Sequence, residues 1–509
     1  MNAFRADGFA APSPARHDPR PVAVVIGSGF GGLAAAIRLS VMGYRVQVLE
    51  KNEAPGGRAC AFSQDGFTFD AGPTIITAPF LLEELWALCG RRFADDVTLL
   101  PMDPYYRVRF HDGSHFDYNG DPEHMRREVA RFAPEDLPGY ERFLEAAEKC
   151  RKLGFEGMGA TAFDRVSDLL RAIPDFLRMG AWRSLHTLVA QHFRNDKLRT
   201  VMSFHPLLIG GNPFDVTAAY ALINALERNW GVHSALGGTG AIVTAMVNLL
   251  AERGVTVRCQ APVTRIRIEG GRASGVVLEN GESIDADIVV SNGDTAWTYK
   301  NLVPAEHRRV WTDRKIARGK YSMGLFVWYF GTSRRWDEVP HHMMVLGPRY
   351  QGLLHDIFKR QHLADDFSLY LHRPSASDPS VAPAGCDTFY ALSPVPHLDS
   401  GTDWAQVAET YRERIAQALE ASVLPGLREH IVCSQVRTPQ TFHDRLWSFK
   451  GAGFGLEPLL TQSAWFRPHN RSEDIPGLYM VGAGTHPGAG VPGVLMSAKA
   501  LQSVVPHVH

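Results

Sequence analysis

The sequence lacks long apolar runs, paired cysteines and a secretory signal. No run approaches the ~18 apolar residues of a membrane-spanning helix, so none is predicted. The 6 cysteines are scattered and form no C-x-x-C pair, which favours free thiols in a reducing compartment over a disulfide framework or a zinc site. Residues 1–20 contain no apolar core of ~7–15 residues, which excludes a secretory signal and predicts a loose leader.

The sequence also has no excess of charge of either sign. The chain has 53 basic and 54 acidic residues, a net charge of −1, and no long basic block, so we expect no nucleic-acid partner. Hydrophobic content of 45% and charged content of 21% are typical of a soluble globular enzyme. A length of 509 residues exceeds one compact core and predicts two or three intertwined domains.

The stretch Val22–Glu50 predicts a dinucleotide site. It has the pattern of a strand, a glycine turn, a helix and a second strand, and Gly27, Gly29 and Gly32 form G-x-G-x-x-G at the turn. The helix N-terminus offers unpaired N–H groups and partial positive charge to a pyrophosphate. Glu50 ends the second strand, where an acid accepts hydrogen bonds from a ribose. The predicted contacts in the turn are Gly27, Ser28, Gly29, Phe30, Gly31 and Gly32.

Two further segments follow closely. Lys51 and then Gly56-Gly57-Arg58 place backbone and a guanidinium near the same cofactor, where Arg58 would pair with a diphosphate or simply close a loop. The turn Gly72-Pro73-Thr74 then precedes a short apolar strand. Near the other end, Val481-Gly482 forms the end of a strand and a glycine turn, and a helix starts at Gly493. The N-terminus of this helix would face a ligand group on which negative charge builds up during the reaction.

The long middle of the chain has two patterns. Residues 78–230 are mostly helical by apolar spacing, with an amphipathic helix at Pro138–Leu153. A second helix at Ile173–Phe193 would either cover the core or rest on lipid through Trp182, Leu185, Leu188 and Val189, with Arg178 and Arg183 at head groups. Residues 254–292 predict three strands that return to the first domain, and residues 300–465 predict a mixed sheet that floors an apolar pocket.

These motifs together resemble the flavoprotein amine-oxidase and desaturase superfamily, because G-x-G-x-x-G, the acid and Gly-Gly-Arg occur in this order. The segments FHPLLIGG (204–211), SMGLFVWYFG (322–331), ALSPVPH (391–397) and VGAGTHPGAGVPG (481–493) narrow the resemblance to the bacterial-type phytoene desaturases. The likeness covers about residues 22–503. It is essentially the whole chain.

The resemblance implies an α/β fold with a Rossmann-like FAD-binding domain, an interleaved α+β substrate domain and a helical membrane-associating region. The FAD domain would be discontinuous, formed by residues 21–77, 231–299 and 466–509. Residues 78–230 would form the membrane-associating region and residues 300–465 the substrate domain. Further FAD contacts implied by the resemblance are Val263, Gly482, Ala483, Gly484, Val491, Pro492, Gly493 and Val494. Many superfamily members carry an Asp after the turn glycine, and Ala483-Gly484 stands there instead.

The same resemblance implies desaturation of 15-cis-phytoene toward neurosporene or lycopene, by hydride transfer to flavin N5. The enzyme would lie peripherally on the cytoplasmic side of the cell membrane, take its polyene from the bilayer, and be reoxidised by quinone or oxygen. The alternatives are a desaturase of a hydroxylated or methoxylated carotenoid or of diapophytoene, a flavin amine oxidase, and a non-catalytic carotenoid carrier.

The sequence assigns no catalytic side chain. No amino-acid side chain accepts a hydride, so the flavin must do so. His205 is the nearest candidate for a base or cation-stabilising group, although histidines in such segments more often pack or hydrogen-bond. Arg142 and Arg151 are weaker candidates on a solvated helix face. No metal site is expected, because the histidines at 341, 342, 355, 362 and 372 show no ligand spacing.

Overall fold

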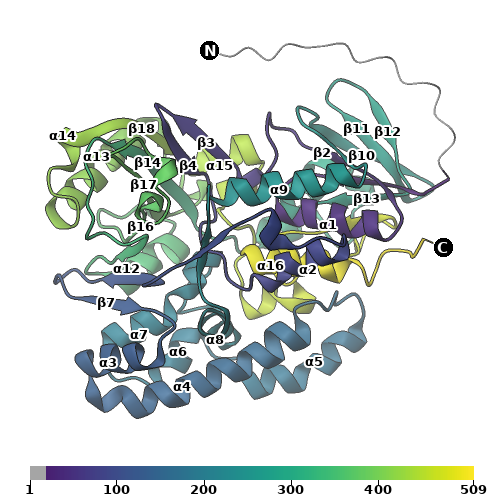
Figure 1. Ribbon diagram of the computed structural model, residues 1–509. Coiled ribbons are helices and arrows are strands. Elements are labelled where there is room, and N and C mark those ends of the chain that lie inside the picture. The colour runs from purple at the N-terminus through teal and green to yellow at the C-terminus, as the bar shows by residue number, and fades with distance from the viewer. Residues whose placement is uncertain (1–18, 509) are drawn as a thin grey trace.

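The structure is a computed structural model that describes residues 19–508. The leader predicted over residues 1–20 therefore falls, apart from its last two residues, outside the described range. The described chain forms a mixed α/β fold with two large sheets and a layer of helices below them (Figure 1).

The first sheet is parallel and has the strand order β19-β13-β1-β2-β9. Three of its strands, β1 (VAVVI), β13 (IVVS) and β19 (LYM), are almost entirely apolar, which is typical of strands covered on both faces. Ala23 and Val25 pack on helices α1, α9 and α16, whereas Val24 and Ile26 pack on the small sheet β10-β11-β12. The strands are β1 (Val22–Ile26), β2 (Arg45–Leu49), β9 (Thr256–Arg258), β13 (Ile288–Ser291) and β19 (Leu478–Met480), and the small sheet contains β10 (Val263–Glu269), β11 (Arg272–Leu278) and β12 (Ser283–Asp285).

The second sheet has seven strands in the order β18-β14-β17-β16-β15-β6-β7, antiparallel except for the pair β15 and β6. Alternation along β14 divides its faces: Phe326, Trp328 and Phe330 pack toward helix α13, and Leu325, Val327 and Tyr329 face the opposite way. The strands are β6 (Tyr106–Arg109), β7 (His115–Tyr118), β14 (Gly324–Thr332), β15 (His342–Val345), β16 (Leu369–His372), β17 (Asp387–Val395) and β18 (Ile431–Arg437).

The region predicted as mostly helical also contains strands. β6 and β7 belong to the seven-stranded sheet, and β5 (Leu99–Pro101) pairs with β8 (His233–Ala235). The alternating segment 106–118 turns at Asp112-Gly113, a local signal that the helical spacing around it concealed. Strands β3 (Ala61–Gln64) and β4 (Phe67–Asp70) form a separate hairpin.

The single helix predicted at Ile173–Phe193 is wrong. Helix α5 (Val166–Met179) ends at Gly180, which has a left-handed φ of 66°, and α6 (Leu185–Ala190) starts after Ser184, whose side chain caps it. Leu185, Leu188 and Val189 are consequently buried. Only Trp182 of the predicted lipid face is exposed.

The helices of the lower layer and of the sheet faces have the following bounds. They are α1 (Phe30–Val41), α2 (Phe80–Leu88), α3 (Pro122–Phe132), α4 (Leu137–Cys150), α7 (Asp196–Ser203), α8 (Leu222–Trp230), α9 (Thr239–Glu252), α10 (Thr295–Trp297), α11 (Asp313–Arg318), α12 (Tyr350–His355), α13 (Trp404–Ser422), α14 (Leu427–His430), α15 (Pro439–Leu446) and α16 (Val491–Leu501). A π-helical segment, η4 (Arg151–Glu156), extends α4. In the described chain no helix is both long and apolar enough to cross a membrane.

Candidate cofactor and substrate cavity

One large cavity lies between the parallel sheet, the seven-stranded sheet and the helical layer. Its cavity volume is about 520 Å³, within the ~300–1,000 Å³ range of ligand-binding pockets. Its lining comes from segments at both ends of the chain and from the middle.

The predicted cofactor residues line one part of this cavity, which we call the cofactor cradle. Only Gly32, Gly482 and Gly484 of the predicted set do not line it. The cradle residues are Gly27, Ser28, Gly29, Phe30, Gly31, Glu50, Lys51, Gly57, Arg58, Gly72, Pro73, Thr74, Val263, Ala483, Val491, Pro492, Gly493 and Val494.

The glycines outside the lining serve close packing. A Cβ on Gly32 would lie 2.0 Å from the carbonyl oxygen of Gly27, so only glycine lets α1 approach β1. A Cβ on Gly484 would lie 1.9 Å from Thr295 Oγ1. These contacts hold the turns of the cradle in place.

Two helix N-termini reach the cradle without a side-chain cap. α1 begins after Gly29 and α16 after Gly490, and neither N-cap residue offers a side-chain hydrogen bond. Neither first turn carries an acidic residue that would neutralise its partial positive charge. Both termini therefore suit a negatively charged ligand group.

Arg58 is the clearest sign of an anionic ligand. It is buried enough that desolvation lowers its pKa, with the Asp294 carboxylate opposing this effect. Its Nη2 donates to Ser448 Oγ at 2.9 Å, but its Nε has no hydrogen-bond partner among the described residues. A diphosphate would satisfy this orphaned donor.

Glu50 is buried at the end of β2, and its carboxylate is already well bonded. One oxygen accepts from the N–H and hydroxyl of Ser28, at 3.0 and 2.6 Å, and the other from the N–H and side-chain amide of Asn52, at 2.9 and 3.0 Å. These bonds fix the acid beside the glycine turn. A ribose would share or replace the bonds from the Ser28 hydroxyl and the Asn52 amide. The cradle as a whole thus fits an adenine dinucleotide.

The rest of the cavity is an apolar chamber lined by the inward face of β14 and by the helical layer. Apart from Glu50 of the cradle, the described residues that line the cavity include two carboxylates, Glu227 and Asp294, and Asp294 acts on Arg58. Its main lining residues are Phe155, Met158, Phe176, Met179, Phe204, Leu207, Leu208, Tyr220, Leu226, Glu227, Met323, Leu325, Val327, Tyr329, Met344, Leu354, Tyr370, Tyr390 and Leu392.

His205 lies behind the chamber wall. It is fully buried, stacks on Phe204 with ring centroids 4.2 Å apart, and approaches Glu227 with Nε2 3.1 Å from Oε2. Tyr106 donates to the other Glu227 oxygen at 2.7 Å. The structure therefore places Glu227 and Phe204, but not His205, against the cavity.

Neither arginine candidate lines the cavity. Arg142 is exposed. Arg151 is buried, contrary to the expected solvated face, because Glu148 and Glu156 bind its guanidinium at 2.7 and 2.5 Å.

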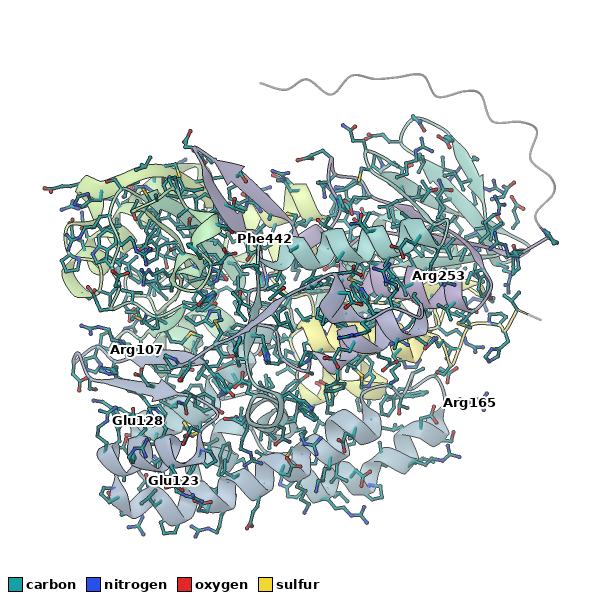
Figure 2. The ribbon with its side chains drawn as sticks, viewed as in Figure 1. Arg107, Glu123, Glu128, Arg165, Arg253 and Phe442 are labelled. Carbon is teal, nitrogen blue, oxygen red and sulfur yellow. The ribbon has the colours of Figure 1, made fainter. Side chains whose placement is uncertain are left out.

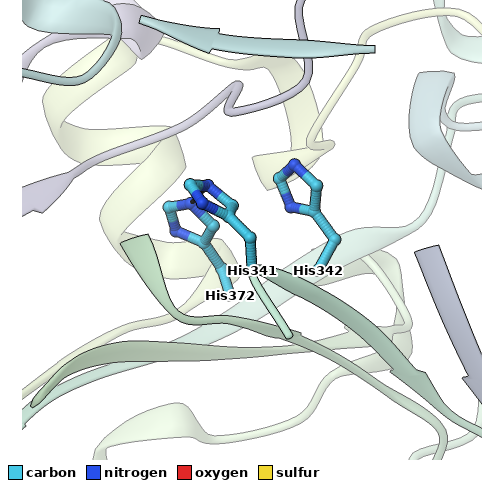
Figure 3. Close-up of side chains that lie close together, drawn as sticks. All are labelled: His341, His342 and His372. Atoms are coloured by element: carbon cyan, nitrogen blue, oxygen red, sulfur yellow. Dashed lines mark hydrogen bonds between the residues drawn. The ribbon is translucent and has the colours of Figure 1, made fainter. Parts of the chain in front are cut away.

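Sequence reasoning missed two polar features, one in the cavity wall and one behind it. His486 lines the cavity, and because Met158 supplies only a carbonyl acceptor 3.0 Å away, its Nε2 carries the proton and leaves Nδ1 without a partner. Burial lowers the pKa of His486 to about 4. His341, His342 and His372 form a second group behind Tyr370, with ring nitrogens within 4.8 Å of one another (Figure 3). Their separation along the chain concealed this cluster, which pairing of β15 with β16 creates.

Comparison with known proteins agrees with this architecture. Residues 30–500 match the family of flavin containing amine oxidoreductases. The neurosporene-forming phytoene desaturase of Cereibacter sphaeroides is 50% identical over 489 residues, which cover 95% of this chain and 94% of that protein. The lycopene-forming phytoene desaturase of Pseudescherichia vulneris is 47% identical over 485 residues, which cover 95% of this chain and 98% of that protein.

A solved structure of an oxidoreductase from Methanosarcina mazei has the same fold. Its TM-score is 0.66 at 18% sequence identity, covering 95% of this chain and 100% of that one. The predicted fold class and FAD cofactor are thereby confirmed. The chain belongs to the flavin containing amine oxidoreductases and, within them, to the family of the bacterial phytoene desaturases.

Proposed function

We propose that the chain is an FAD-dependent desaturase that converts 15-cis-phytoene by successive steps to neurosporene, lycopene or both. Support comes from the relatives above, whose names state these products. The observation that carries the proposal is the continuity of the cavity, in which the cofactor cradle opens directly into the apolar chamber. A long hydrocarbon would lie there beside the flavin.

The chain's own residues would prepare this reaction in three ways. When bound, the flavin supplies the hydride acceptor. Arg58, the glycine turns and the two helix N-termini hold its dinucleotide, and Thr74 places a hydroxyl where the cradle meets the chamber. The apolar walls on β14 and η4 exclude water and fix the polyene by its length and shape.

The test is anaerobic mixing of FAD-loaded protein with phytoene in liposomes. Bleaching of the flavin, and a chromatogram that shows neurosporene or lycopene, are expected. Consumption of diapophytoene or a hydroxylated carotenoid in preference to phytoene would move the assignment to those substrates. Hydrogen peroxide released from amines would indicate an amine oxidase, and a flavin that no carotenoid bleaches would indicate a carrier.

We also propose that the enzyme docks peripherally on the cytoplasmic side of the cell membrane through a defined apolar patch. The patch, called the α5 surface, consists of exposed apolar side chains in and just after α5. Their exposed fractions are 60% for Leu170, 59% for Leu177 and 64% for Trp182, well above that of a core residue. Val166 and Ile173 complete it.

The charges and position of the α5 surface suit a bilayer. Arg171 and Arg178 are largely exposed beside it, where lipid phosphates would bind them, and Trp182 suits the interfacial layer. Figure 2 shows Arg165 at this end of the helical layer, opposite the end that carries Glu123 and Glu128.

The same helix also reaches the chamber. Phe176 and Met179 line the cavity while Leu170 and Leu177 face outward, so α5 is apolar on two sides. A polyene that leaves the bilayer beside α5 would need to pass only one helix to reach the chamber. The electron acceptor that reoxidises the flavin would be a membrane quinone or oxygen.

A further inference from the structure

We propose that a buried chain of hydroxyl and imidazole groups conducts the proton released by desaturation from the apolar chamber to the protein surface. This inference rests on the proposed function. Each new double bond requires the loss of one hydride and one proton. Among the other described residues that line the cavity, Glu227, Asp294 and the unpartnered Nδ1 of His486 are the competing acceptors. We call the chain the tyrosine–histidine relay; it consists of Tyr390, Thr74, Tyr370, His342, His372, His341 and Ser377.

The inner end of the relay lies in the cavity wall. Thr74 Oγ1 is 2.8 Å from the Tyr370 hydroxyl and 3.1 Å from the Tyr390 hydroxyl, and all three residues line the cavity. Thr74 belongs to the cofactor cradle, whereas both tyrosines belong to the chamber. The relay therefore begins where cofactor and polyene would meet.

The hydrogen bonds from Thr74 through Tyr370 to His342 point outward. The Tyr370 hydroxyl lies 2.6 Å from His342 Nδ1. Burial raises the pKa of Tyr370, so its hydroxyl stays protonated and donates to Nδ1. Thr74 must then donate to Tyr370, and Tyr390 has two acceptors within reach, Thr74 Oγ1 at 3.1 Å and the Gly72 carbonyl oxygen at 3.4 Å. Thr74 and Tyr370 are thus set to pass their protons toward His342.

Three neutral imidazoles continue the relay. The bond from Tyr370 leaves the proton of His342 on Nε2, which has no hydrogen-bond partner among the described residues. The next group is His372, whose Nδ1 also has no hydrogen-bond partner among the described residues. The ring nitrogens of the three histidines lie within 4.8 Å of one another, and transfer from His342 to His372 would need a rotation of the His342 ring (Figure 3). His341 and His372 already share a hydrogen bond of 3.0 Å between their Nε2 atoms.

The imidazoles are suited to transfer because they rest uncharged. Burial lowers the pKa of His341 to about 3 and the pKa values of His342 and His372 well below the usual range. The Asp378 carboxylate opposes the shift at His341, and Arg373 adds to it. A neutral imidazole accepts a proton at one nitrogen and donates one from the other, so it conducts without trapping charge.

The outer end reaches the surface. His341 Nδ1 lies 3.0 Å from the hydroxyl of Ser377, which is half-buried on the loop after β16. Pairing of His342 with His372 across β15 and β16, and the two-residue spacing of Tyr370 and His372, put these side chains on one sheet face. The sheet thus provides the rigid frame of the relay.

Atoms and electrons balance in the proposed step. FAD held by the cradle would supply the hydride acceptor for the adjacent carbon. The C–H bond that loses the proton would break, its electron pair would form the new C=C bond, and the proton would move to a relay hydroxyl. That hydroxyl simultaneously passes its own proton to His342, and one proton leaves from Ser377 to water.

The experiment compares Tyr370→Phe and His342→Phe with the control Tyr411→Phe, which removes an equally buried hydroxyl bonded to Ser393 away from the cavity. Flavin bleaching and proton release, followed with a pH indicator, are recorded during one anaerobic turnover. Both relay variants should bind FAD normally and bleach roughly 100-fold more slowly, since proton transfer groups contribute ~10²–10⁴-fold. Tyr411→Phe should match the wild type.

Bleaching and prompt proton release at the wild-type rate in both relay variants would overturn the relay. So would a delay confined to Glu227→Gln, which would make that carboxylate the acceptor. A wild-type protein that does not bleach at all would refute the proposed function instead.

Two measurements need no turnover. NMR of protein labelled with ¹⁵N-histidine should show His342 neutral with its proton on Nε2 near neutral pH; a cationic His342 would overturn the relay. Metal analysis is the second, because three converging imidazoles also suit Zn²⁺. A stoichiometric metal ion lost in His342→Phe would contradict the relay, since bound nitrogens cannot carry protons.

Discussion

The cofactor cradle and the apolar chamber are parts of one cavity, yet they are built on opposite principles. The cradle presents backbone, two uncapped helix N-termini and the orphaned Arg58 donor, supplied by segments from both ends of the chain. The chamber presents apolar side chains from β14 and the helical layer. A charged cofactor needs fixed N–H groups, whereas a hydrocarbon needs only shape and dryness. The two parts should therefore respond differently to substitution.

The largest expected effect is a loss of folding stability when the close packing around the cradle is disrupted. Gly32→Ala places a methyl group 2.0 Å from the Gly27 carbonyl oxygen, and backbone cannot yield there cheaply. We expect the free energy of unfolding to fall by about 3 kcal/mol or more, measured by urea denaturation. The control Gly157→Ala meets no atom closer than 3.4 Å and should be neutral or stabilising. Equal stability of the two variants would contradict the close-packing explanation.

The next largest effect is on FAD affinity, which substitutions in the cradle should lower. Arg58→Ala removes the diphosphate partner and should weaken FAD binding by roughly 10- to 100-fold, since hydrogen bonds to charged groups contribute ~1.5–3 kcal/mol. Glu50→Ala should also lower flavin content. Titration of apo-protein by flavin fluorescence measures both, with exposed Arg92→Ala as the control. Wild-type affinity in both variants would refute the cofactor assignment of these residues.

A polar substitution in the chamber should have the opposite effect, weakening substrate binding while leaving flavin binding unchanged. Val327→Asn puts an amide on the inward face of β14, where no water would solvate it. The KM for polyene should rise about tenfold, because an unpaired buried polar group costs ~1–3 kcal/mol. Flavin content, measured by absorbance, should not change. Loss of flavin together with substrate would show that the two parts are not independent.

The proposed docking through the α5 surface would give the chamber, unlike the cradle, access to lipid. Leu170→Gln combined with Leu177→Gln removes apolar area from the α5 surface and should lower the fraction of protein that floats with liposomes about tenfold. Val432→Gln is the matched control, because Val432 is 51% exposed on β18, far from α5 in sequence. Equal flotation of both variants would remove the α5 surface as the docking site.

The smallest expected effect is on the pH dependence of folding stability. Glu457 is buried with one carboxylate oxygen unpartnered, and burial together with the nearby Asp215 raises its pKa from 4.5 to about 7. Because the folded state holds this proton more tightly than the unfolded state, stability should fall as pH rises from about 4.5 to about 7. Thermal unfolding of Glu457→Gln across this range should show a flatter dependence. A pH dependence of thermal unfolding identical to that of the wild type would rule out Glu457 as the cause.

The sequence predicted the cradle far better than the chamber, for a physical reason. Close approach of backbone to a phosphate requires glycine at fixed spacing, so Gly27, Gly29 and Arg58 could be assigned from local pattern. The chamber depends on which residues the seven-stranded sheet brings together, and nothing in the local sequence around Tyr370 or Glu227 reveals that. His205 was singled out for its motif, but the fold places Glu227 between it and the cavity. The break at Gly180 likewise moved the exposed apolar face from Leu185 to Leu170.

The order of strands in the parallel sheet has a consequence for synthesis of the protein. β1 and β2 are translated first, but their sheet is completed at its other edge by β19, and the second uncapped helix N-terminus comes from α16. Every element of the chamber is translated between them. The chamber elements therefore leave the ribosome before β19 and α16 complete the cradle, so tight flavin loading would come late in biogenesis. The proposed α5 surface is also translated before those elements, so membrane contact would be able to precede cofactor capture.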